Sequence, residues 1–193
     1  MVVKLKCIVI GGGKIGKSSL LHTYKDFAFP TDYEVPSCPN FQSRTINADG
    51  TDYQLDIHDA PEYQFDEYYQ DADVCLLVYS LIDRSSFEDI QSKYYREVQR
   101  VPGPRTAPFV LVGTKKDRRD EGTAKESVST EEGNQLSKSI NANHFVECSS
   151  MTQQGLREVF DYAVRAFQKS GAKPKGGKSS KSKSGKKSGC IIN

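Results

Sequence analysis

Two repeating patterns of apolar and polar residues run along this chain of 193 residues. Short apolar or alternating runs, which are typical of β-strands, occupy residues 2–10, 41–46, 51–58, 73–79, 107–112 and 143–148. Between them lie segments that can form helices: 19–24, 85–98, a segment that begins at 129, and 156–167. Because strands alternate with helices, the sequence predicts one doubly wound α/β domain whose mostly parallel sheet is covered on both faces.

Local signals predict where these elements begin and end. Asp49-Gly50 is typical of a hairpin turn, so the strands on either side of it should pair antiparallel. The segments Ser85–Glu88 and Ser129–Glu132 each fit a capping box and predict two helix starts. Polar segments are expected to form a loop at 26–41, a loop or short helix at 59–72, and a connection at 118–128.

The charge distribution divides the chain into two parts. Although the whole chain has a formal net charge of +2, the segment from Lys169 onward holds eight lysines and no acid, which leaves 19 basic and 25 acidic residues over 1–168. We therefore expect a domain over 1–168 and a disordered polybasic tail over 169–193. An acidic domain argues against a nucleic-acid-binding protein. We also expect the protein to be a monomer.

Size and cysteine content exclude several other classes of protein. No apolar run approaches the ~18 residues of a membrane span, and no secretory signal opens the chain. The five cysteines have no paired spacing, which indicates a reducing cytosol with neither a disulfide framework nor a zinc site.

The chain ends Cys190-Ile-Ile-Asn, which fits a C-a-a-X prenylation motif at Cys190. A lipid and a lysine tract together are the two signals that stable attachment to an anionic membrane needs.

The strongest chemical signal is a P-loop directly after the first strand. Residues 11–18 (GGGKIGKS) fit G-x-x-x-x-G-K-[ST], between a predicted strand and a predicted helix. Glycines let backbone N–H groups turn towards phosphate oxygens, Lys17 supplies a charge for the outer phosphates, and the Ser18 hydroxyl can bind Mg²⁺. The predicted phosphate-binding residues are Gly11, Gly13, Lys14, Ile15, Gly16, Lys17, Ser18 and Ser19.

A second motif, Thr114-Lys115-Lys116-Asp117, directly follows the fourth long strand. A carboxylate at Asp117 can accept hydrogen bonds from N1–H and the 2-amino group of guanine, a pair that adenine does not offer. The stem of Lys115 can lie along the base while its ammonium approaches the P-loop backbone. Thr114, Lys115 and Asp117 therefore predict a guanine site. By itself, this charged cluster could equally be a solvated surface.

Together the two motifs resemble the Ras superfamily of small GTPases, and within it the Rho/Rac branch. The resemblance also includes 28–37 (AFPTDYEVPS), 79–88 (YSLIDRSSFE), 95–98 (YREV), 147–150 (ECSS) and 155–160 (GLREVF). It implies GTP or GDP and Mg²⁺ as ligands. Phe29 is expected to stack on guanine, Ser37 and Asp59 to contribute with Ser18 to the Mg²⁺ site, and backbone N–H groups of Ser149 and Ser150 to bind guanine O6.

The chain departs from this family where GTP is hydrolysed. The family sequence D-x-x-G-Q is replaced by Asp59-Ala60-Pro61-Glu62, in a segment several residues shorter than in the family. Pro61 has no N–H to offer the γ-phosphate, and only Glu62 or Gln64 could stand in for the water-orienting Gln. One extra residue separates Phe29 from Ser37, and Lys14 is unusual within a P-loop.

Two functions from different classes follow from this pattern. The first is a slowly hydrolysing Rho-like switch at the cytoplasmic face of a membrane, such as the plasma membrane. The second is a non-cycling binding module, which the D-A-P-E segment favours. A P-loop ATPase or kinase is a weaker third reading, because it gives the T-K-K-D motif no purpose. The resemblance implies that effectors and regulators bind residues 27–41 and 59–72. We assign no role to His58 or Cys38.

Overall fold

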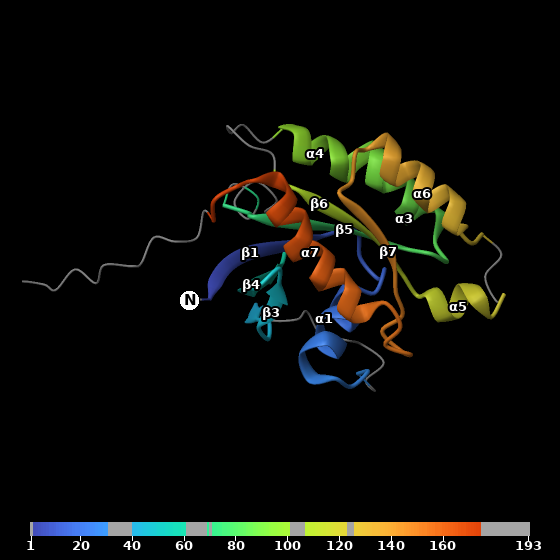
Figure 1. Cartoon of the computed structure of the whole chain (residues 1–193). Helices are drawn as coiled ribbons and strands as arrows, with labels where there is room; N and C mark the ends of the chain where they lie inside the picture. Colours follow the sequence, from blue (N-terminus) through green and yellow to red (C-terminus); the bar gives the residue numbers. More distant parts are fainter. Residues whose placement is uncertain are drawn as a thin grey trace, which may run out of the picture.

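The computed structural model describes residues 2–30, 40–60, 69, 71–100, 107–122 and 126–174. Its centre is a seven-stranded sheet with the strand order β2-β4-β1-β5-β6-β7, and β3 pairs with β4 (Figure 1). The strands are β1 (Val3–Ile10), β2 (Phe41–Gln42), β3 (Ile46–Ala48), β4 (Thr51–Asp59), β5 (Val74–Ser80), β6 (Phe109–Thr114) and β7 (His144–Glu147). β4, β1, β5, β6 and β7 are parallel, whereas β2 and β3 run antiparallel to β4. The expected α/β fold with a mostly parallel sheet is confirmed.

Helices cover both faces of this sheet. They are α1 (Lys17–Asp26), α3 (Arg84–Asp89), α4 (Tyr95–Arg100), α5 (Lys116–Asp120), α6 (Thr130–Ser139) and α7 (Leu156–Ser170), and a π-helical turn at Ile90–Tyr94 joins α3 to α4. α1 and α7 pack on one face, and α3, α4 and α6 pack on the other (Figure 1). α5 follows β6 at the edge where the parallel strands end.

The alternation of side chains along each strand explains the two-layered core. On β1, Cys7 and Val9 pack with α1 and α7, whereas Ile8 and Ile10 pack with the helices of the other face. Successive residues of a strand point to opposite faces, so the part of a strand that is covered on both faces must be apolar, as residues 7–10 of β1 are. The apolar stripe of α7 lies on this core as expected, and its Phe160 ring stacks on Tyr24 of α1 at 3.7 Å between centroids.

The predicted hairpin and one capping box are confirmed. Asp49 and Gly50 have φ values of 51° and 77°, the positive pair that a type I′ turn requires. Ser129 Oγ accepts from the Glu132 N–H at 3.2 Å, and the Glu132 carboxylate accepts from the Ser129 N–H at 2.9 Å. This reciprocal pair fixes the start of α6.

The other predicted capping box is wrong. Asp83 caps α3 instead, and its carboxylate accepts from the Ser86 N–H at 3.3 Å. The Ser86 hydroxyl donates to Asp83 O at 2.7 Å and accepts from Ser80 N at 3.0 Å, so it fastens the helix start to the end of β5. The N-cap of α3 is therefore Asp83, two residues before the predicted Ser85.

Three further expectations need correction. The predicted strand 41–46 is interrupted after β2, because the Ser43 hydroxyl accepts from Leu55 N at 2.9 Å in place of a ladder carbonyl. The predicted polar connection 118–128 begins within a helix, since α5 spans Lys116–Asp120. α7 likewise continues to Ser170, two residues into the segment expected to be a disordered tail.

Candidate nucleotide-binding site

The P-loop runs from the end of β1 into α1 and is shaped by close backbone packing. Gly11 is required because a Cβ there would lie 2.3 Å from the carbonyl oxygen of Val78. Gly16 has φ 99°, and Lys14 also takes a left-handed conformation with φ 60°. Positive φ is costly for a residue such as Lys14, and strain of this kind persists only where surrounding contacts enforce it.

Lys17 and the first turn of α1 line the inside of this loop. The Lys17 ammonium donates to the carbonyl oxygens of Gly11 and Gly12 at 2.6 and 2.7 Å. The first intrahelical bond runs from Leu20 N to Gly16 O, so the N–H groups of residues 17–19 lack an intrahelical acceptor. The N-cap residue of α1 is Gly16, which has no side chain that could cap this helix start. These donors, the helix dipole and the ammonium together suit a phosphate chain.

Asp59 and Ser18 supply oxygen atoms next to this loop. Asp59 ends β4, which pairs with β1, and Ser18 lies in the first turn of α1. Burial raises the pKa of the Asp59 carboxyl, and the charge of Lys17 opposes this rise. Hydroxyl and carboxylate oxygens are ligands that Mg²⁺ prefers, with phosphate oxygens completing its coordination. The described residues hold no cluster of three or more His, Cys, Asp or Glu side chains that could bind a metal without a nucleotide.

The T-K-K-D motif meets the P-loop as the sequence predicts for Lys115. Its ammonium donates to the carbonyl oxygen of Lys14 at 2.8 Å, and burial lowers the pKa of Lys115. Thr114 is 1% exposed, and its hydroxyl contacts the carbonyl oxygen of Ile15. Two side chains from the end of β6 therefore hold the P-loop backbone. Asp117 lies half-buried in the first turn of α5.

The segment after β7 lies against the T-K-K-D motif. Lys116 N donates to Cys148 O at 3.0 Å, and this bond brings Ser149 and Ser150 close to Asp117. The Ser149 N–H donates to Gln154 O at 2.9 Å, so the loop itself uses one of the two backbone donors expected to reach guanine O6. The N–H of Ser150, whose side chain is 8% exposed, remains the candidate donor.

The 149–155 loop also contacts the segment that carries Phe29. Neither sequence motif indicates this contact. Gln153 Nε2 donates to Phe27 O at 3.0 Å, which joins the 149–155 loop to the chain after α1. Phe29 is 39% exposed two residues further on. Sequence reasoning missed Gln153; its φ of 62° is a property of the fold and leaves no mark in the sequence.

Several predicted site residues lie outside the described residues. These are Ser37, Glu62, Gln64 and Cys190, so their roles stay predictions. Cys38 also lies outside. Among the described residues, Cys7, Cys75 and Cys148 are buried cysteines that form no disulfide, and burial raises the pKa of the Cys148 thiol to about 12, which leaves it protonated and unreactive. His58 is largely buried on β4, and its Nε2 lies 3.1 Å from the Asp56 carboxylate of the same strand, a structural contact.

None of the described helices is both long and apolar enough to cross a membrane. A protein-family model described as the Ras family matches residues 6–169, which include the P-loop, the T-K-K-D motif, the 149–155 loop and most of α7. The match covers the greater part of the chain. The chain belongs to the Ras family, the small GTPases that bind GTP and GDP, typically together with Mg²⁺.

Proposed function

We propose that this protein is a Rho-like GTP-binding switch with very slow intrinsic hydrolysis, attached by a prenyl group to the cytoplasmic face of an anionic membrane. The base would bind between Asp117, Ser150 N–H and Phe29, the phosphates on the P-loop, and Mg²⁺ to Ser18, Ser37 and Asp59. Effectors and regulators would bind residues 27–41 and 59–72. The Rho-like assignment comes from the sequence resemblance described above.

The observation that carries the slow hydrolysis concerns the chain directly after Asp59. Ala60 is buried, and its N–H donates to Val9 O at 3.1 Å. Pro61 follows and has no N–H. Neither residue can therefore donate a backbone hydrogen bond to a γ-phosphate, and the next residue, Glu62, would bring negative charge towards it. Removing one preorganised donor commonly costs roughly 10²–10³ in rate.

A non-cycling binding module is the second candidate, and the same observation favours it. The P-loop side chains and Asp59 remain in place, so nucleotide binding should persist where chemistry fails. The two candidates differ in whether the γ-phosphate is ever cleaved and in whether it changes partner binding.

Single-turnover hydrolysis on GTP-loaded protein separates these readings. We expect a rate at least about 10²-fold below that of an ordinary Rho protein assayed in parallel. A Pro61→Gly, Glu62→Gln variant restores an N–H and an amide at unchanged length, and it should hydrolyse GTP faster than the native chain. A native rate equal to that of the reference protein would overturn the slow-hydrolysis proposal. A native chain with no measurable turnover, and equal partner binding with GTP and GDP, identifies the non-cycling module.

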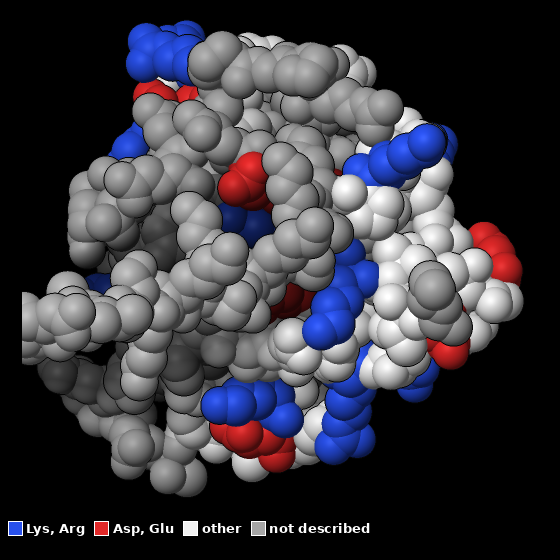
Figure 2. All heavy atoms as spheres, turned by 90° about the vertical axis from the view of Figure 1, so that its left-hand side faces the viewer, with Lys and Arg blue, Asp and Glu red and all other residues white. Residues whose placement is uncertain are grey.

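Membrane attachment gains support from where the chain leaves the domain. β1 begins and α7 ends at the same end of the domain, away from the P-loop edge of the sheet (Figure 1). Lys and Arg side chains occur at several places on the described surface of that end (Figure 2). Lys4, Lys169 and Lys173, at the start of β1 and the end of α7, are exposed. Each such charge near an anionic leaflet contributes about 1 kcal/mol.

A further inference from the structure

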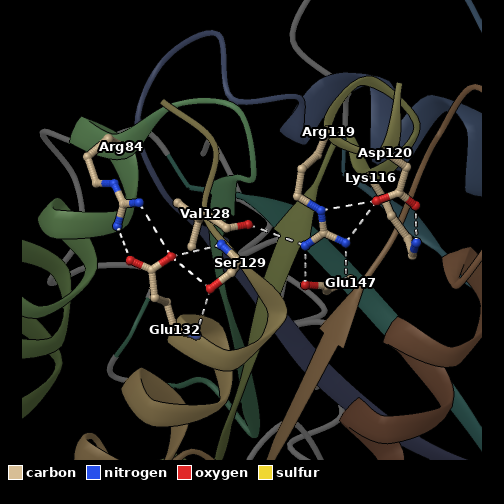
Figure 3. A network of polar contacts seen from close by, with 8 residues as sticks. All are labelled: Arg84, Lys116, Arg119, Asp120, Val128, Ser129, Glu132 and Glu147. Atoms are coloured by element: carbon tan, nitrogen blue, oxygen red, sulfur yellow. Dashed lines mark hydrogen bonds and ion pairs between the residues drawn. The ribbon is translucent and has the colours of Figure 1, made fainter. Parts of the chain in front are cut away.

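Two Arg–Glu ion pairs lie in one polar network between α3 and the end of β7 (Figure 3). In the first, Arg119 donates from both terminal nitrogens to the Glu147 carboxylate at 2.5 and 2.8 Å. These side chains are only 12% and 9% exposed. Arg119 also donates to Val128 O at 3.3 Å and to Asp120 at 3.1 Å, so this one side chain joins three segments. A bidentate, largely buried pair of this kind fixes geometry as well as charge.

The segments joined by Arg119 and Glu147 are the two that carry the base-binding residues. Arg119 lies two residues after Asp117 on α5, and Glu147 ends β7 three residues before Ser150. α5 has five residues, too few for a helix to hold its own shape, so its position depends on tertiary contacts. The backbone bond from Lys116 N to Cys148 O fixes one point between the segments. The Arg119–Glu147 pair fixes a second point, which removes the freedom to pivot about the first.

We propose that Arg119 and Glu147 are positioning residues for guanine recognition. By locking α5 against the end of β7, the pair holds the Asp117 carboxylate and the Ser150 N–H at the separation that guanine requires. Neither residue is assigned a contact with the base itself. The pair therefore sets how long the nucleotide stays bound and how strongly guanine is preferred. This inference rests on the base site assigned under the proposed function.

The second ion pair in the network supplies a matched control. Arg84 donates to both oxygens of Glu132 at 2.6 and 3.4 Å (Figure 3). It also donates to Ser127 O at 3.0 Å. It joins the start of α3 to the start of α6 and touches neither base-binding segment. A general loss of stability follows from breaking either pair, whereas a loss of base discrimination follows from breaking the Arg119–Glu147 pair alone.

The test uses the full chain loaded with fluorescent GDP or fluorescent IDP, whose base lacks the 2-amino group that Asp117 would bind. Dissociation rates and urea midpoints are measured for Arg119→Gln, Arg119→Lys, Arg84→Gln and Asp117→Asn. Loss of a partner that orients a binding group costs about 10–100-fold in affinity at metal sites. By that measure we expect Arg119→Gln to release GDP at least about tenfold faster and to bring the GDP and IDP rates closer together. Arg119→Lys keeps one charged contact. Its GDP release rate and its preference for GDP over IDP should therefore lie between those of Arg119→Gln and the native protein.

Arg84→Gln should lower the urea midpoint and leave the ratio of GDP to IDP rates at the native value. The inference is overturned if Arg119→Gln, or Arg119→Lys where the first variant does not fold, leaves that ratio at the native value while Asp117→Asn changes it. It is also overturned if Arg84→Gln narrows the ratio as much as Arg119→Gln does. If Asp117→Asn leaves guanine preference unchanged, the base-site assignment fails and this inference fails with it.

Discussion

Replacing Thr114 by valine tests how the sheet holds the P-loop. The Thr114 hydroxyl contacts Ile15 O in the P-loop and lies 3.0 Å from Tyr79 O on β5. Its single hydrogen can serve one of these carbonyls at a time. Valine has nearly the same shape and suits a β-strand, so the change removes the hydrogen bond without opening a cavity.

The expected loss follows from the burial of this group. Thr114 is 1% exposed, so a carbonyl that loses its donor has no access to water here. An unsatisfied buried group costs about 1–3 kcal/mol. We expect the free energy of unfolding to fall by this amount, which corresponds to a Tm about 2–12 °C lower in a domain of this size.

Thr23 of α1 provides a control of the same residue type. Its replacement by valine is not expected to lower the free energy of unfolding. It is 0% exposed, and within the described part of the chain its hydroxyl has no hydrogen-bond partner. Thr23→Val removes a buried hydroxyl whose desolvation nothing offsets. It should leave the free energy of unfolding unchanged or raise it by about 1 kcal/mol.

Urea unfolding at one fixed GDP concentration measures both variants. Bound nucleotide adds RT ln(1 + [GDP]/Kd) to the observed stability, so GDP affinity is measured separately and its contribution subtracted. The reasoning is refuted if the corrected stability of Thr114→Val lies within about 0.5 kcal/mol of the native value. A Thr23→Val protein that loses more stability than Thr114→Val refutes it equally.

Three more outcomes are expected. Gln153→Ala removes the 3.0 Å bond to Phe27 O and should speed GDP release about 2- to 12-fold in a fluorescent-GDP assay. The control is Gln168→Ala, which removes a similar bond to Ala48 O at 3.3 Å and should leave GDP release unchanged. The bonds from Arg84, then those from Ser129, lower the pKa of Glu132 to about 2 from an ordinary value of about 4.5. The contribution of this carboxylate to stability is therefore complete above pH 4.5 and disappears as pH falls towards 2. The urea midpoints of the native protein and of Glu132→Gln should converge between pH 4.5 and pH 2, and a constant difference between them would contradict this. Cys190→Ser should move the protein from the membrane to the cytosolic fraction of cells, and its retention on membranes would exclude the lipid anchor.

The sequence alone determined the fold class and the two motifs that define the base and phosphate segments. Strand segments covered on both faces must be continuously apolar, and this requirement makes β5, β6 and the second half of β1 visible in the sequence. The P-loop pattern specifies its own backbone geometry, because Gly11 is needed where a Cβ would meet Val78 O at 2.3 Å. Such constraints are local or periodic, so single-sequence reasoning can find them.

The groups that hold these motifs in place became visible only in the folded structure. Gln153, Arg119 and Glu147 act on partners that are distant in the chain, and neither their residue type nor their spacing reveals those partners. Ser149 shows the same limit, because its N–H was expected to bind guanine and is instead used within its own loop. A hydrogen bond or ion pair between distant segments depends on how the sheet and helices pack, and packing depends on the whole chain at once.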